Sequence, residues 1–293
     1  MKLAHFSDIH VTHFPLVGAW AFKRLAAVAS YTLIGRGRHF TGADTRIAAL
    51  LADVDAQQVE HALCTGDVTG VAAEAEFARC AELFGPRLKE PQRFTLIPGN
   101  HDRYVASAIR AGWFERHFSA LSGAFPLVKP LPGDVTIVAI DTARPTSVID
   151  SSGLVGEAQL RKLEAILTDG SLRDRFVVLA LHYGLLRANG RRDKRNHGLR
   201  DDLELTALID RPDAFVDLVV HGHMHTGYAV RTARRHVINA GSATDLHTRC
   251  GYNVYEIDTK AWRLTCTRRA WNPVSGTYEA AADSKLNLSL STR

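Results

Sequence analysis

Five short polar motifs, far apart in the chain, each come at the end of an apolar run that suits a buried strand. The motifs are Asp8-Ile9-His10, Gly66-Asp67, Gly99-Asn100-His101-Asp102, Leu181-His182 and Gly222-His223-Met224-His225. The apolar runs cover residues 2–7, 61–65, 94–98, 176–181 and 217–221. Ligands of open α/β sheets bind outside the carboxyl ends of the strands. The order of the motifs therefore predicts an α/β protein whose polar side chains meet at one sheet edge.

The motifs offer carboxylate oxygens, an amide oxygen and imidazole nitrogens, and they contain no thiolate. This mixture of hard and borderline ligands suits Mn, Fe or Zn in a reactive site, not zinc in a structural cage. A carboxylate can bridge two cations, and two metal ions about 3.5–4 Å apart can hold a hydroxide while binding the oxygens of a phosphoryl group. The donor set thus indicates in-line displacement at phosphorus.

The ordered set resembles the calcineurin-like metallophosphoesterases, whose pattern reads D-x-H, G-D, G-N-H-D or G-N-H-E, a lone His, and G-H-x-H. The resemblance covers residues 1 to about 245, and every motif occurs in the family's order. It implies a four-layer α/β/β/α sandwich that binds two divalent metal ions (Mn, Fe or Zn). Carried over position by position, it assigns Asp8, His10 and His225 to one metal, Asn100, His182 and His223 to the other, and Asp67 to both.

His101 has no metal in that assignment and stands between Asn100 and a second carboxylate, Asp102. We expect His101 to donate a hydrogen bond or a proton to the leaving oxygen, while Asp102 fixes its tautomer and keeps it protonated. His221, which directly precedes the last motif, is expected to pack beneath the site.

A basic segment follows His182 and is expected to form a loop above the metals. It contains Arg187, Arg191, Arg192, Lys194, Arg195 and Arg200. Guanidinium groups there could bind phosphate or a second anionic group of the substrate, and a solvated basic loop is an equally good interpretation. Arg191, Arg192, Arg195 and His197 are the candidate substrate contacts.

A second unusual segment, residues 14–40, mixes large apolar residues at nearly helical spacing with Lys23, Arg24, Arg36 and Arg38. Lys23 and Arg24 interrupt the run well short of the ~18 uncharged residues that a membrane span requires. Three interpretations remain: a cap packed on the core, a dimer contact, or an amphipathic element that meets a lipid-linked substrate or a membrane surface. Packing on the core is the one we favour.

The scattered motifs indicate a single catalytic domain over residues 1–270, with 14–40 as a cap-like insertion and 271–293 as a C-terminal extension. No structure is expected from residue 280 onward, where the chain is polar. Helices are predicted near 44–60, 74–84, 156–168 and 201–209, and further strands near 135–140, 236–239, 252–257 and 263–268. The oligomeric state is not predicted.

The four cysteines show no paired spacing, so we expect reduced, mostly buried thiols and a cytoplasmic protein, with peripheral membrane contact as an option. No cleavable signal is expected before the first strand, because Asp8 is already a ligand. The net charge of +5 suits an anionic substrate. Nucleic acid is not an expected partner, because no long basic stripe with interleaved aromatic residues is present.

The function that these features predict is hydrolysis of a phosphodiester, with a phosphorylated small molecule or a lipid-linked compound as substrate. Asp141-Thr142 and the segment 156–167 with Gln159 are loosely similar to the class III cyclic-nucleotide phosphodiesterases. The alternative is a UDP-2,3-diacylglucosamine pyrophosphatase of lipid A synthesis, whose acyl chains would suit residues 14–40. A metal-dependent scaffold without turnover is the alternative of another class.

Overall fold

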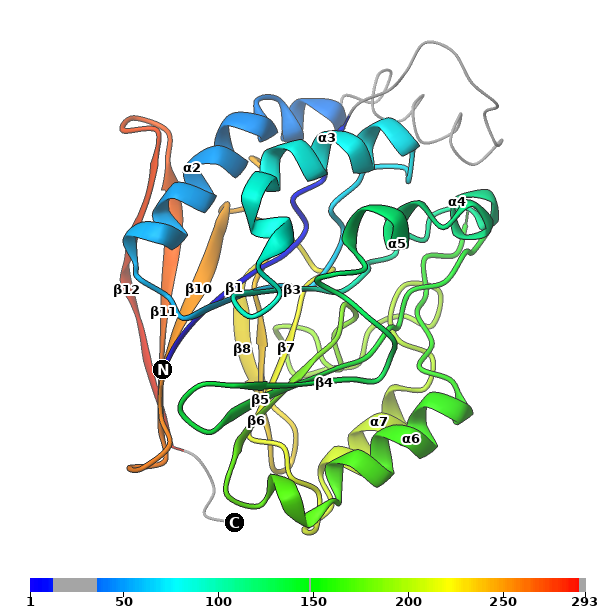
Figure 1. Cartoon of the computed structure of the whole chain (residues 1–293), viewed down its shortest axis with the longest axis vertical. Coiled ribbons are helices and arrows are strands. Elements are labelled where there is room, and N and C mark those ends of the chain that lie inside the picture. The colour runs from blue at the N-terminus through cyan, green and yellow to red at the C-terminus, as the bar shows by residue number, and fades with distance from the viewer. Residues whose placement is uncertain (13–35, 148, 290–293) are drawn as a thin grey trace.

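Two six-stranded mixed sheets form the centre of the molecule (Figure 1). The computed structural model describes residues 1–12, 36–147 and 149–289. The first sheet has the order β12-β11-β10-β1-β2-β3, with bounds β1 (Lys2–Phe6), β2 (His61–Cys64), β3 (Phe94–Leu96), β10 (Gly251–Asp258), β11 (Arg263–Asn272) and β12 (Thr277–Ser289). Within it, β1, β2 and β3 are parallel, whereas β10, β11 and β12 pair in antiparallel fashion.

The second sheet has the order β4-β5-β6-β7-β9-β8. Its strands are β4 (Leu127–Leu131), β5 (Val135–Ala139), β6 (Phe176–Ala180), β7 (Leu218–His221), β8 (Tyr228–Arg231) and β9 (His236–Asn239). The four central strands, β5, β6, β7 and β9, are parallel, and β4 and β8 close the two edges in antiparallel fashion. Parallel strands deliver their carboxyl ends to one edge, which is where the predicted ligands follow.

Helices cover the outer face of each sheet (Figure 1). The helices on the first sheet are α2 (Ala43–Ala56), α3 (Glu74–Phe84), α4 (Ala106–Ala111) and α5 (Trp113–Phe118), and those on the second are α6 (Glu157–Leu167) and α7 (Asp202–Ile209). Short 3₁₀ turns lie at η1 (Arg36–Phe40), η2 (Gly85–Lys89) and η3 (Gly170–Leu172). The arrangement confirms the predicted α/β/β/α sandwich.

Side-chain alternation along the strands divides the hydrophobic core into three layers. Along β6, Val177 and Leu179 face the cluster that contains the apolar sides of α6 and α7. Phe176, Val178 and Ala180 face the cluster between the two sheets. Successive side chains of a strand point to opposite faces, so an uninterrupted apolar run is what a strand buried on both faces requires. A third cluster joins the first sheet to α2, α3, α4 and α5.

The C-terminal strand corrects the prediction that the chain has no structure from residue 280. β12 is a 13-residue strand that pairs with β11 along nearly its whole length, with a register shift between Thr267 and Arg269. Its sequence is rich in small and polar residues because it is the outer strand of its sheet and much of it is exposed. The signal in the sequence was confined to the end of the strand, where Leu286 and Leu288 alternate with polar residues. The buried Tyr278 anchors it to the core.

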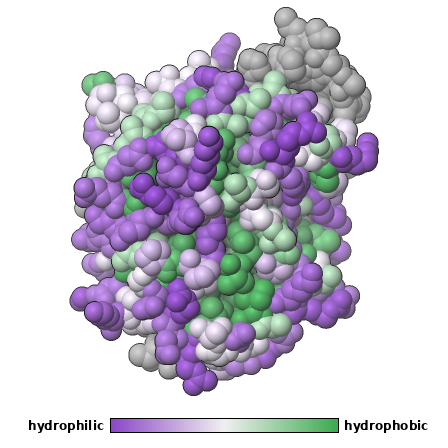
Figure 2. All heavy atoms as spheres, in the orientation of Figure 1, coloured by the Kyte–Doolittle hydropathy of each residue, from purple (hydrophilic) through white to green (hydrophobic). Residues whose placement is uncertain are grey.

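The surface is mainly hydrophilic on the face that Figure 2 shows, with hydrophobic side chains gathered where Figure 1 places β4. All four cysteines are free and buried, as predicted. Among the described residues, no helix has the length and apolar character needed to cross a membrane. Most of the insertion at 14–40, including Trp20, lies outside the described residues, so its role stays a prediction.

Candidate metal centre

The centre is built from loops that follow β1, β2 and β3 of one sheet and β6 and β7 of the other. Backbone pairing continues past the strands: Asp8 N donates to Gly66 O at 2.9 Å, and His10 N donates to Asp67 O at 3.0 Å. The glycines of the motifs are required by this close approach. A Cβ atom on Gly99 would lie 2.1 Å from Asp67 Oδ1, and one on Gly222 would lie 1.9 Å from Ser7 Oγ.

Many of the predicted ligands have a backbone conformation that ordinary residues rarely adopt. Asp8, His10, Asp67, His223 and His225 have φ angles between 41° and 70°. The left-handed region costs free energy for residues other than glycine and persists only where the surrounding structure enforces it. Here it turns consecutive motif residues toward a common point instead of along the loops.

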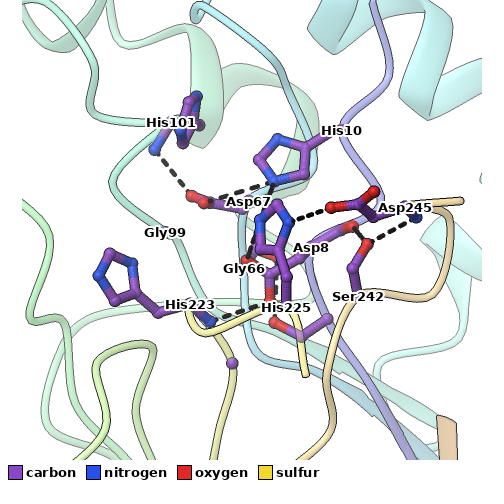
Figure 3. A network of polar contacts seen from close by, with 12 residues as sticks. Asp8, His10, Gly66, Asp67, Gly99, His101, His223, His225, Ser242 and Asp245 are labelled. Carbon is purple, nitrogen blue, oxygen red and sulfur yellow. Dashed lines mark hydrogen bonds and ion pairs between the residues drawn. The ribbon is translucent and has the colours of Figure 1, made fainter. Parts of the chain in front are cut away.

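The first ligand set comprises Asp8, His10 and His225 (Figure 3). His10 donates through Nδ1 to Thr69 O, and His225 donates through Nδ1 to Asp245 Oδ2 at 2.7 Å. In each neutral ring the proton is therefore on Nδ1, and Nε2 carries a lone pair. The two Nε2 atoms lie 3.0 Å apart, and the Nε2 of His225 is 3.6 Å from Asp8 Oδ1.

The second ligand set comprises Asn100, His182 and His223. His182 donates through Nδ1 to Thr65 O, and His223 donates through Nε2 to His197 O. Their other nitrogens, Nε2 of His182 and Nδ1 of His223, lie 3.0 Å and 2.9 Å from Asn100 Oδ1. Asp67 stands between the sets, with Oδ2 3.8 Å from His10 Nε2 and 3.4 Å from His182 Nε2.

The two sets fit divalent cations on chemical grounds. In each set, acceptor atoms converge on one point, because the protons of the neutral imidazole rings point away to carbonyl or carboxylate oxygens. Asp8 Oδ1 is buried and has no hydrogen-bond partner among the described residues, which is costly for a carboxylate oxygen unless a cation binds it. Outer partners that hold the ligating histidines in one tautomer are typical of metal sites. The residues present therefore suit two cations joined by Asp67.

Charge within the centre is strongly coupled. Burial opposes ionisation of Asp67, but the His182, His101 and His10 rings outweigh it and hold the pKa of Asp67 well below its usual range. Burial likewise favours neutral His182, yet the Asp67 carboxylate raises the pKa of His182 to about 9. In protein without cations, His182 thus carries a proton that cation binding would release.

His101 lies beside the first set, with its ring centroid 4.8 Å from that of His10. Its main-chain N donates to Asp67 Oδ1 at 2.7 Å, and its ring donates through Nδ1 to Gly70 O. Tyr104 stacks on the ring at 5.3 Å between centroids. These contacts fix the plane of the His101 ring.

The expected partnership between Asp102 and His101 is wrong. Asp102 accepts hydrogen bonds from the main-chain N–H groups of Val68, Thr69 and Gly99 and from the Thr69 hydroxyl. Its carboxylate therefore joins the loops after β2 and β3, while Gly70 O takes the role of fixing the His101 tautomer. Burial raises the pKa of Asp102 to about 7, against the effect of these donors. Asp102 positions the loops of the centre and does not touch the His101 ring.

Comparison with known proteins agrees with this geometry. The family model described as calcineurin-like phosphoesterase matches residues 1–227. The chain belongs to the calcineurin-like phosphoesterases. No curated protein sequence matches it significantly.

Solved structures show that this calcineurin-like phosphoesterase shares its fold with distant proteins. A dimetal phosphatase from Danio rerio has a TM-score of 0.64 at 10% identity, with 99% of each chain covered. GAP50, the anchor in the inner membrane complex of Plasmodium, has a TM-score of 0.60 at 11% identity, with 100% of this chain and 90% of that chain covered. A purple acid phosphatase from yellow lupin has a TM-score of 0.58 at 12% identity, covering 95% of this chain and 52% of the other.

The basic loop of this calcineurin-like phosphoesterase approaches the centre at one residue. His197 lies 4.4 Å from His223 between ring centroids, and its Nδ1 pairs with Asp193 Oδ2 at 2.6 Å. Arg192 instead forms a two-pronged ion pair with Asp202 at the start of α7. Arg191 and Arg195 are exposed on the same loop. Contact of these four residues with a substrate stays a prediction.

Two residues of the centre were not found from the sequence, Ser242 and Asp245. Ser242 Oγ donates to Asp8 O at 2.6 Å and accepts from Asp245 N at 2.9 Å, so it joins the loop after β9 to the loop after β1 (Figure 3). They lie beyond the last motif and belong to no motif of their own. The one signal was position, because they follow strand β9 at the same sheet edge as the ligands. His221 is fully buried as predicted.

Proposed function

We propose that this chain is a binuclear metal-dependent phosphodiesterase that hydrolyses a phosphorylated small molecule or a lipid-linked phosphate. The observation that carries the proposal is the orientation of four histidines. Each donates one ring proton to an oxygen outside the centre, so that four ring nitrogens, Asn100 and two carboxylates converge as acceptors. Such a pair of sites supports hydrolysis, because two cations held there would bind the same phosphoryl group.

Two divalent cations bound there would supply a nucleophile at neutral pH and neutralise charge on the phosphoryl oxygens. The chain's own residues would do the rest. Asp67 would hold the cations at a fixed separation, and its Oδ1 also accepts the main-chain N–H of His101. His101 would act in its doubly protonated form, because Nδ1 already donates to Gly70 O, and would donate from Nε2 to the departing oxygen, where negative charge develops. Gly70 O and Tyr104 would keep that ring in place.

A diester is favoured over a monoester by the charge near the second ligand set. Although the loop is basic, Arg192 is paired with Asp202 and His197 with Asp193. Few positively charged side chains of the loop are therefore fixed in place to balance the extra negative charge of a monoester. The lipid pyrophosphatase alternative rests on residues 14–40, of which 14–35 are not described. In the described part of the segment, Phe40 packs on His10 at 4.9 Å between ring centroids.

The test is a comparison of substrates with purified protein reconstituted with Mn²⁺, Fe²⁺ or Zn²⁺. We expect two metal ions per chain by elemental analysis and faster hydrolysis of bis-p-nitrophenyl phosphate than of p-nitrophenyl phosphate. Cyclic nucleotides and UDP-diacylglucosamine then separate the two substrate classes. One metal or none per chain would contradict the binuclear site. Two metals without hydrolysis of any of these esters would support a scaffold instead.

A further inference from the structure

Arg268, on β11, is a partly buried cation whose hydrogen-bond partners among the described residues are all uncharged. Its Nη1 donates to Ala240 O at 2.6 Å and to Asn253 Oδ1 at 3.3 Å, and its Nη2 donates to Arg249 O at 3.1 Å. No carboxylate of the described residues pairs with it. Burial lowers the pKa of Arg268, and the nearby Arg249 acts in the same direction. Charges withdrawn from water are usually paired, and the described residues supply no counter-ion for this guanidinium.

The chain provides a dedicated space for this guanidinium. A Cβ atom on Gly227 would lie 2.3 Å from Arg268 Nη1, and Cβ atoms on Gly241 and Gly251 would each lie 3.0 Å from Nη2. Three glycines from three different segments therefore surround one side of the charge. The arrangement resembles a built site more than a side chain that happens to be covered.

Beside Arg268 a cavity of about 250 Å³ opens at the seam between the two sheets. The strands β8 and β9 form one wall, and β10, β11 and β12 form the other. Its polar lining comprises Tyr228, Asn239, Arg249, Asn253, Arg268 and Ser284, and its apolar lining includes Ala229, Ile238, Ala281, Ala282 and Leu286. No acidic side chain that the structure describes is part of the lining. Every lining residue except Gly227 lies beyond the 1–227 match to the family.

We propose that this cavity binds a small organic oxyanion, with the carboxylate or phosphate head at Arg268 and Arg249 and an apolar tail against Ala282 and Leu286. Guanidinium groups pair with both kinds of head through two parallel hydrogen bonds. The volume is below the usual range for drug-sized ligands, so the tail is short. The site is separate from the metal centre, to which Arg268 is linked through the main chain: Ala240 O accepts from Arg268, and Ser242 N donates to His225 O.

The test uses metal-loaded full-length protein and three probes with the same propyl tail: butyrate, propyl phosphate and neutral butyramide. Thermal melts and calorimetric titration should show saturable binding of at least one of the two anions and none of butyramide. Which anion binds more tightly identifies the head group. Equal stabilisation by all three probes, or by neither anion, would overturn the proposal.

Variants locate the binding. Arg249→Gln and Ala282→Trp change exposed positions at the cavity, so both should fold, and each should weaken anion binding at least tenfold. Arg231→Gln is the matched control, because it removes an exposed charge of β8 that does not line the cavity. His223→Ala separates the sites: binding at the seam should survive it. Loss in His223→Ala with none in Arg249→Gln would assign the anion to the metal centre and refute the seam site.

Discussion

The two halves of the metal centre differ in what stands behind their histidines. In the first half, His225 donates to a carboxylate, that of Asp245. In the second half, His182 and His223 donate only to the main-chain oxygens of Thr65 and His197. A carboxylate behind an imidazole raises its basicity and its hold on a metal more than a neutral carbonyl does. We therefore infer that the first cation is bound more tightly and that the second exchanges more easily.

The groups that support the two halves also come from different parts of the chain. Thr65 directly follows β2, within the matched family region, whereas Asp245 lies in the loop after β9, beyond that region. Asp245 is itself held by Ser242, which donates to Asp8 O. The C-terminal part of the chain therefore supports one half of the centre, and changes there should affect one metal alone.

The largest effect should come from Asp67→Ala, which removes the group shared by both halves. Loss of an outer partner alone typically costs 10–100-fold in metal affinity, so loss of a shared ligand should exceed about 100-fold at both sites. Hydrolysis should fall almost to background. Elemental analysis of the purified variant checks this, with His10→Ala as the matched control that should weaken mainly the first site. Retention of two tightly held metals in Asp67→Ala would show that the halves are independent.

His101→Ala should come next, and it should leave both halves intact. Because His101 donates to Gly70 O and is not required as a ligand, metal content should stay near two per chain. General acid–base groups typically contribute about 10²–10⁴-fold to the rate, so kcat should fall in that range for substrates with poor leaving groups. The loss should shrink for p-nitrophenyl esters, which need little protonation. An equal loss for both kinds of substrate would show that His101 does not assist departure.

The sequence was informative where strands end and less so beyond them. The apolar runs that precede Asp8, Asp67 and His182 are strands buried on both faces, and a strand of that kind has little freedom in where it ends. The same reasoning placed the four long helices, α2, α3, α6 and α7, to within a few residues of their observed bounds.

The failures have physical causes. The sequence predicts a contact between Asp102 and its neighbour His101. In the structure, the Asp102 carboxylate instead accepts from main-chain N–H groups, which lie closer to it after the tight turn than the adjacent side chain does. Asp245 was missed because contact with His225 spans 20 residues and depends on how β9 ends. β12 was missed because residues 279–284 are small or polar and alternation is confined to residues 285–289. Each depends on long-range contacts that local pattern does not record.

Asp245→Asn should weaken one half only. The amide oxygen can still accept from His225, but it carries no charge, so affinity for the first cation should fall by about 10–100-fold while the second changes little. Asp193→Asn is the matched control on the other half, because Asp193 pairs with the His197 ring and not with its carbonyl oxygen. Stepwise competition with a chelator measures both affinities. Equal weakening of the two sites by Asp245→Asn would break the proposed asymmetry.

The smallest effect should be a pH dependence of stability in protein stripped of metals. His182 has a pKa of about 9 in the folded chain because Asp67 faces it, compared with about 6.5 in an unfolded chain. A raised pKa means that the folded state binds the proton more tightly. The stabilisation is therefore complete below pH 6.5 and is lost as the pH rises through 9.

Since the interaction is shared with Asp67, we expect about 1–2 kcal/mol of unfolding free energy. Denaturant titrations from pH 6.5 to 9.5 measure it. His182→Gln is the comparison, because Asp102, whose pKa is also raised, is present in both proteins and its contribution cancels in their difference. Added Mn²⁺ should flatten the profile, because the cation displaces the proton. If His182→Gln keeps the full slope of unfolding free energy against pH, His182 does not bind this proton in the folded state. The contrast between the two halves would then rest on Asp245 alone.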